Sequence, residues 1–112
     1  MDFTIIKHAV RVDEGIKRFS MQFIKSIAAP DRKRLSAELC EQIRDELDKL
    51  GLVTLPRRIP TSETDSLWII ERDSEMGELV LLGETLARFR SVGVPPVMDV
   101  LDQFPKAGRA VE

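Results

Sequence analysis

Apolar side chains recur at helical spacing in two stretches of the chain. In the first stretch, steps of four, three, four and four residues separate Val12, Ile16, Phe19, Phe23 and Ile27. In the second stretch, the apolar residues are Leu35, Leu39, Ile43, Leu47 and Leu50. Each spacing places its side chains on one face of a helix. We therefore predict two helices, and the few residues between them favour an antiparallel helical hairpin.

Local signals indicate where the two predicted helices begin and end. Pro30 disfavours helix in the residue before it, so the first helix should end there. Asp31 or Ser36 can cap the start of the second helix. Gly51 is a typical C-terminal stop signal for that helix. Residues 1–10 alternate apolar and polar side chains too irregularly for an assignment.

Beyond Gly51 the pattern becomes typical of β-strands. Residues 52–55 are β-prone and end at Pro56, and residues 67–71 form a dense apolar run. We expect these two segments to pair as an antiparallel hairpin, joined by a polar loop that stays extended and solvated. Because apolar residues flank Trp68 on both sides, its strand is predicted to be central and covered on both faces.

The C-terminal third allows two interpretations. Residues 78–82 form either a third strand followed by a helix from about Glu84, or part of one helix over residues 74–90. Two internal glycines would cost such a helix about 1 kcal/mol each, which favours the strand. A short helix is predicted over residues 96–104. The expected fold class is α+β, with a helical hairpin on a small antiparallel sheet of two or three strands and one or two C-terminal helices.

Composition is typical of one soluble globular domain, which we expect over residues 1–104 with a flexible tail over residues 105–112. The 112 residues are 43% apolar and 32% charged. No apolar run exceeds four residues, far short of the roughly 20 that a membrane-spanning helix needs. The N-terminus also lacks the apolar stretch of a signal peptide, so a cytoplasmic location and no membrane partner are expected.

The residue types that carry chemistry are sparse. Cys40 and His8 are the chain's one cysteine and one histidine, which excludes an intrachain disulfide and a Cys/His zinc site. Four carboxylates cluster at Glu71, Asp73, Glu75 and Glu78. Their order lacks the fixed spacing of a calcium-binding loop, and the chain has no glycine-rich phosphate loop. We therefore expect no enzymatic activity, no cofactor and no metal site.

Charge is distributed unevenly along the chain. Residues 1–60 carry 12 basic and 9 acidic side chains, whereas residues 61–112 carry 5 and 10. An acidic stripe on the second predicted helix consists of Glu38, Glu41, Asp45 and Asp48. A basic side on the first predicted helix consists of Arg11, Lys17, Arg18 and Lys25. Oppositely charged surfaces of this kind can meet in a homo-oligomer.

Residues 36–71 resemble the winged-helix family. The segment runs from a helix through Asp48-Lys49-Leu50-Gly51-Leu52-Val53 into a strand, a loop with Arg57 and Arg58, and a second strand. In that family the helix before such a turn is the recognition helix, and the hairpin is the wing. The family also has a short helix and a tight turn before the recognition helix, for which residues 29–35 leave little room.

Two functional hypotheses follow from these features. The first is a non-enzymatic adaptor that acts through protein association, and most simply as a homo-oligomer such as a dimer. Its expected partner-binding residues are Arg11, Arg18, Lys25, Val97, Leu101 and Phe104. The second is a winged-helix DNA-binding regulator that contacts phosphates through Arg57, Arg58 and Lys17. An acidic recognition helix repels phosphate, which ranks the adaptor first.

Overall fold

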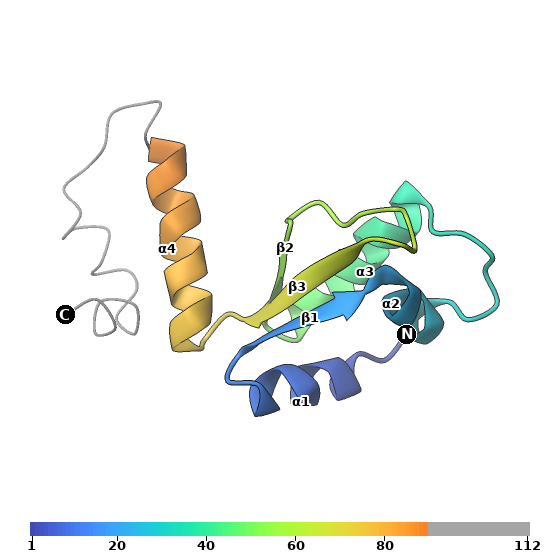
Figure 1. Ribbon diagram of the computed structural model, residues 1–112, viewed down its shortest axis with the longest axis horizontal. Helices are drawn as coiled ribbons and strands as arrows, with labels where there is room; N and C mark the ends of the chain where they lie inside the picture. Colours follow the sequence, from blue (N-terminus) through green and yellow to red (C-terminus); the bar gives the residue numbers. More distant parts are fainter. Residues whose placement is uncertain (90–112) are drawn as a thin grey trace.

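The computed structural model describes residues 1–89, in which three strands form one antiparallel sheet (Figure 1). The strands are β1 (Ile16–Ser20), β2 (Leu52–Leu55) and β3 (Ser66–Glu71), in the order β1-β3-β2. The helices are α1 (Thr4–Val12), α2 (Met21–Ala28), α3 (Ala37–Lys49) and α4 (Glu75–Phe89). The α+β class, the antiparallel hairpin and the central position of β3 are confirmed. The helix predicted over residues 96–104 lies outside the described part of the chain.

The first predicted helix is wrong, because a turn and the strand β1 interrupt its sequence. Glu14 and Gly15 adopt positive φ angles of 64° and 97°, which end α1 and direct the chain into β1. Ser20 then caps α2, where its hydroxyl oxygen accepts a hydrogen bond from the Phe23 amide at 3.1 Å. The apolar spacing therefore runs across three elements by coincidence, and no helical hairpin forms. The unassigned N-terminal residues form α1.

The second predicted helix is confirmed as α3. The Ser36 hydroxyl oxygen accepts a hydrogen bond from the Leu39 amide at 3.1 Å, so Ser36 is the N-cap. Gly51 follows the helix with a φ angle of 74°, a conformation that favours glycine. Four residues of the predicted apolar stripe are buried, with Ile43 and Leu47 fully inaccessible, and Leu50 at its end is half-buried.

Residues 75–89 form the single helix α4, so the favoured strand over residues 78–82 is wrong, and the third strand of the sheet is β1. Ser74 caps α4, where its hydroxyl oxygen accepts a hydrogen bond from the Gly77 amide at 2.9 Å. A Cβ atom at Gly77 would lie 2.0 Å from the Glu71 carbonyl oxygen. Close packing against the end of β3 therefore explains a glycine inside this helix.

The core lies between the sheet and helices α1, α2 and α3. In Figure 1, α3 lies behind the strands, α2 continues beyond the tip of β1, α1 runs below β1, and α4 stands beyond the opposite end of the sheet. The buried side chains of the core include Phe3, Ile6, Val10, Phe19, Met21, Ile24, Leu39, Ile43, Leu47, Leu52, Leu67 and Ile69. On the opposite face of the sheet, Trp68 is 43% exposed. The expectation that both faces of β3 are covered is therefore wrong at Trp68.

Candidate functional site

The face of the sheet turned away from the core carries a row of exposed side chains. Trp68 on the central strand pairs directly with Arg18 on β1 and with Leu55 on β2. Directly paired residues of neighbouring strands point to the same face. Leu55 is 38% exposed, and Arg18 is also exposed. We call Arg18, Trp68 and Leu55 the sheet row.

The same face is closed at the end of β3 that leads into α4. Val53 and Ile70 pair across β2 and β3 there, and they are 2% and 0% exposed. Helix α4 packs on β3, beginning where Gly77 approaches the Glu71 carbonyl. The sheet row therefore lies at the open end of a face whose other end is part of the folded interior.

The basic side expected on one helix does not exist, because Arg11 lies on α1, Lys17 and Arg18 on β1, and Lys25 on α2. Three of these four cations form ion pairs. The pairs are Arg11 Nη2 with Glu71 Oε1 at 2.8 Å, Lys17 Nζ with Asp13 Oδ2 at 2.6 Å, and Lys25 with Glu63. The hydrogen bond that Arg11 donates to the Glu71 carboxylate raises the pKa of Arg11. Arg18 forms no ion pair within residues 1–89.

The outward face of α3 is acidic, as the sequence predicted. Glu38, Glu41 and Asp45 are exposed, and none of them forms an ion pair within the described residues. Asp48 lies 3.8 Å from the guanidinium of Arg72. A phosphate backbone laid along this helix would therefore meet three uncompensated carboxylates.

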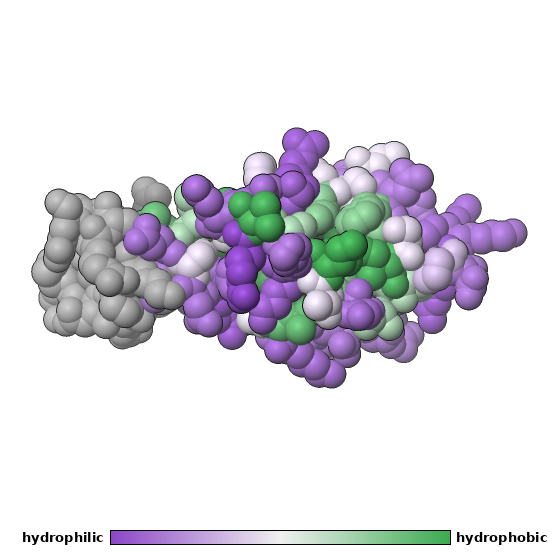
Figure 2. Space-filling view, turned by 90° about the horizontal axis from the view of Figure 1, so that it is seen from below, coloured by the Kyte–Doolittle hydropathy of each residue, from purple (hydrophilic) through white to green (hydrophobic). Residues whose placement is uncertain are grey.

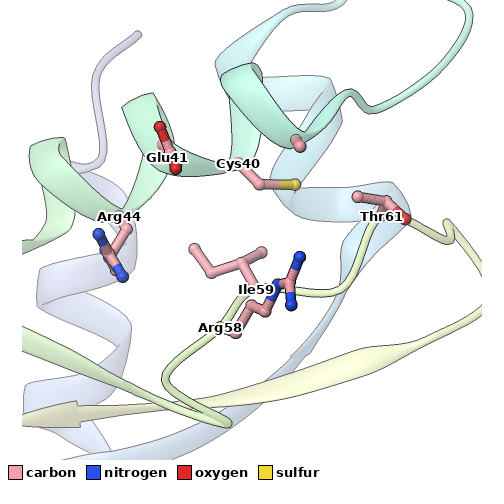
Figure 3. Close-up of a pocket in the computed structure, with 7 residues that line it drawn as sticks. Cys40, Glu41, Arg44, Arg58, Ile59 and Thr61 are labelled. Atoms are coloured by element: carbon pink, nitrogen blue, oxygen red, sulfur yellow. The ribbon is translucent and has the colours of Figure 1, made fainter.

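A cavity of about 300 Å³ lies between α3 and the loop that joins β2 to β3 (Figure 3). Its lining includes Cys40, Glu41 and Arg44 from α3, and Arg58, Ile59 and Thr61 from the loop. Figure 3 shows the guanidinium groups of Arg44 and Arg58 on opposite sides of Ile59. The predicted wing residue Arg58 therefore faces the same cavity as a residue of the predicted recognition helix.

The loop between β2 and β3 is packed at its middle, so the expectation of a fully solvated loop is wrong. Ile59 is 5% exposed and belongs to the core. The Thr54 hydroxyl donates a hydrogen bond to the Arg57 carbonyl at 3.3 Å, and the Cys40 thiol donates one to the Pro60 carbonyl at 3.5 Å. The first of these bonds fixes the start of the loop to β2, and the second holds the loop against α3, where it forms one wall of the cavity.

Cys40 has the environment of a structural cysteine. Its side chain is buried, and burial raises the pKa of its thiol, which disfavours the thiolate that would act as a nucleophile. His8 is exposed on α1. Among residues 1–89, no three His, Cys, Asp or Glu side chains are grouped so that they could hold a metal ion.

The outward side of α1 presents exposed apolar side chains that the sequence interpretation missed. Ile5 is 63% and Val12 is 67% exposed, and seven residues separate them, so they share one side of the helix. Figure 2 views the molecule from the side of α1 and shows separate green patches among purple ones. These apolar side chains are interrupted by polar ones and do not form one continuous surface.

The sequence predicted the acidic face of α3 but neither the sheet row nor the cavity. The partner-binding residues expected at Val97, Leu101 and Phe104 lie outside the described residues. The sheet row was missed because a strand with apolar residues on both faces gives no signal of which face is open. Arg44 and Arg58 line one cavity because the buried Ile59 packs the loop against the core. An apolar residue inside a polar loop was a usable signal of that packing.

Comparison of the chain with protein families, with curated proteins and with solved structures finds no match in any of the three. No helix within residues 1–89 is long and apolar enough to span a bilayer.

Proposed function

We propose that this protein is a non-enzymatic association module of winged-helix type that forms a homodimer through the sheet row. The observation that carries the proposal is the 43% exposure of Trp68 at the centre of the middle strand. Tryptophan and arginine are the residue types most enriched among residues that dominate binding at interfaces. The sheet row combines both types with Leu55 and leaves the Arg18 charge unpaired within residues 1–89.

A second copy fits this surface because of the order of side chains across the sheet. Arg18 lies on one edge strand, Leu55 on the other, and Trp68 between them. If two sheets stack face to face about a two-fold axis parallel to β3, each Arg18 lies over the partner's Leu55. The two Trp68 rings then meet at the axis. The apolar stem of an arginine can cover a leucine while its guanidinium remains in water.

The charge of Arg18 selects between the two orientations that a face-to-face dimer could adopt. An axis running across the strands would place the two Arg18 guanidinium groups over each other, and like charges directly opposite are destabilising. The axis parallel to β3 separates them by two strand spacings, roughly 10 Å across the sheet. The proposal is therefore a dimer in which the two β3 strands run in the same direction.

The element order supports the winged-helix type. Helix α2 is short and precedes α3 in the chain, as the short helix before the recognition helix does in that family. The sequence interpretation had found little room for this short helix. The loop with Arg57 and Arg58 joins β2 to β3 in the position of a wing.

DNA binding is the second candidate, and the observation that favours it is the cavity shared by Arg44 and Arg58. It ranks second because Glu38, Glu41 and Asp45 surround the exposed side of α3 with unpaired negative charge. Protein association requires no such approach of the helix to phosphates.

Light scattering of the full chain over the micromolar concentration range tests the proposal. The apparent mass should rise from 12.7 kDa towards twice that value. The sheet row is smaller than the roughly 800 Å² per partner of a standard interface, so the dissociation constant should be micromolar or weaker. Leu55→Ser should shift the transition to higher concentration, because it removes apolar area at the interface.

The matched control is Ile5→Ser, which removes an exposed apolar side chain from α1 and not from the sheet. It should leave the mass curve unchanged. A chain that stays monomeric throughout, or a dimer that Ile5→Ser dissociates while Leu55→Ser does not, would overturn the proposal.

A further inference from the structure

The cavity between α3 and the β2–β3 loop brings two cationic side chains together from separate elements. Arg44 comes from α3 and Arg58 from the loop, and both guanidinium groups lie at the cavity (Figure 3). Neither forms an ion pair within residues 1–89. Glu41 is the one carboxylate among the lining residues, so the lining keeps a net charge of +1. Two unpaired guanidinium groups at a concave surface favour a bound anion.

The walls of the cavity are held in place by the fold. Ile59 is part of the buried core and lies between the two arginines. The hydrogen bond from the Cys40 thiol to the Pro60 carbonyl ties the loop to α3 at 3.5 Å. A cavity whose walls are already positioned loses less conformational entropy on binding than a flexible loop does.

The lining also has an apolar part. Ile59, Cys40 and Ala37 present carbon and sulfur atoms to the cavity, and Thr61 adds a hydroxyl. A bare inorganic anion would leave this apolar surface unused. An anion with a short apolar body would cover it while its oxygens accept hydrogen bonds from the arginines.

We propose that this cavity is a binding site for a small organic oxyanion, a carboxylate or phosphate monoester with a short apolar body. The oxyanion accepts hydrogen bonds from the guanidinium groups of Arg44 and Arg58, and the apolar body lies against Ile59. The site is distinct from the sheet row and does not depend on the proposed dimer.

Titration of the full chain, followed by the chemical shifts of its backbone amides, tests the site. The probes are isobutyrate, phenyl phosphate and inorganic phosphate, each against chloride at equal ionic strength, with isobutyramide as the neutral control. The amides of Cys40, Arg58 and Thr61 should shift with saturation for an organic anion and not for isobutyramide. The tighter of isobutyrate and phenyl phosphate identifies the anionic group that the site prefers.

Three variants distinguish a built site from general attraction to a basic surface. Arg58→Gln should weaken the binding of the preferred probe by about tenfold or more, because it removes a charge-assisted hydrogen bond. Glu41→Gln should strengthen it by about threefold, because a nearby negative charge is lost. Arg57→Gln is the matched control, since this neighbour does not line the cavity, and it should change nothing.

Two results would overturn the proposal. One is a loss of binding with Arg57→Gln as large as the loss with Arg58→Gln, which would indicate a diffuse basic surface. The other is equal binding of isobutyramide and isobutyrate, which would show that the arginines do not select an anion. Variants that lose their native amide spectrum are replaced by Arg44→Lys, which keeps the charge but loses the planar fork and should still weaken binding.

Discussion

Three consecutive residues of β3 have different environments, although all three are apolar. Ile69 points into the core, Ile70 points to the closed end of the outer face, and both are fully buried. Trp68 points to the open end of that outer face. Sequence alone predicted the strand and its central position but not this difference, because exposure on the outer face depends on where α4 begins.

Alanine substitutions in β3 test the assigned burial. Ile69→Ala and Ile70→Ala should each lower the free energy of unfolding by about 2 to 5 kcal/mol, because each leaves a cavity in a packed region. Trp68→Ala should cost less than either, since part of that side chain is already in water. Urea unfolding followed by circular dichroism provides the measurement. A cost below about 1 kcal/mol for both isoleucines would place β3 at the surface.

The basic residues show why charged contacts could not be assigned from the sequence. Arg11 pairs with a carboxylate 60 positions away, Glu71, and Lys25 with one 38 positions away, Glu63. Neither partner is visible in a helical period of the N-terminal third. Arg18 was expected to bind a partner from the face of a helix. It is exposed on strand β1 instead, where it pairs with Trp68.

At the scale of elements, a helix was predicted correctly where its N-cap, its apolar stripe and its stop residue all indicated the same boundaries. Helix α3 has its cap at Ser36, a buried stripe and a stop at Gly51, and all three are readable in the sequence. The segment from Val12 to Ile27 has the stripe alone. Gly15 and Ser20 interrupt it, and the backbone turn at Gly15 outweighs the helical period.

Two glycines of α4 provide a matched pair of substitutions within one helix. Gly77→Ala should weaken the attachment of α4, because its Cβ atom would meet the Glu71 carbonyl at 2.0 Å. Gly83→Ala should stabilise the helix by about 0.5 to 1 kcal/mol, because no atom lies within 4 Å of the added Cβ. Hydrogen exchange of the α4 amides measures both effects. Equal protection in the two variants would contradict the packing assigned to Gly77.

At the scale of the whole molecule, the sheet joins segments that are far apart in the sequence. Strand β1 pairs with β3 across about fifty residues, from Ile16 with Ile70 to Ser20 with Ser66. The hairpin of β2 and β3 is local and was predicted, whereas this long-range pairing has no local signature. The candidate interface could not be predicted for the same reason, since the sheet row needs all three strands.

The charge distribution of the whole molecule predicts weak binding to DNA. At physiological salt, the full chain should bind duplex DNA no more tightly than the nonspecific range of about 10⁻⁴ to 10⁻⁶ M, because α3 presents unpaired carboxylates. Fluorescence anisotropy of a labelled duplex measures the affinity and its salt dependence. Submicromolar binding that Arg57→Ala together with Arg58→Ala abolishes would make the wing the functional site.

The emission of Trp68 measures the proposed dimer most directly, because the chain contains one tryptophan and it lies at the centre of the sheet row. On concentration through the micromolar range, the emission maximum should move to shorter wavelength as the ring leaves water, in step with the rise in mass. Leu55→Ser should delay this shift, and Ile5→Ser should not. An emission maximum that stays constant while the mass doubles would show that the dimer forms through another surface and would contradict the central claim.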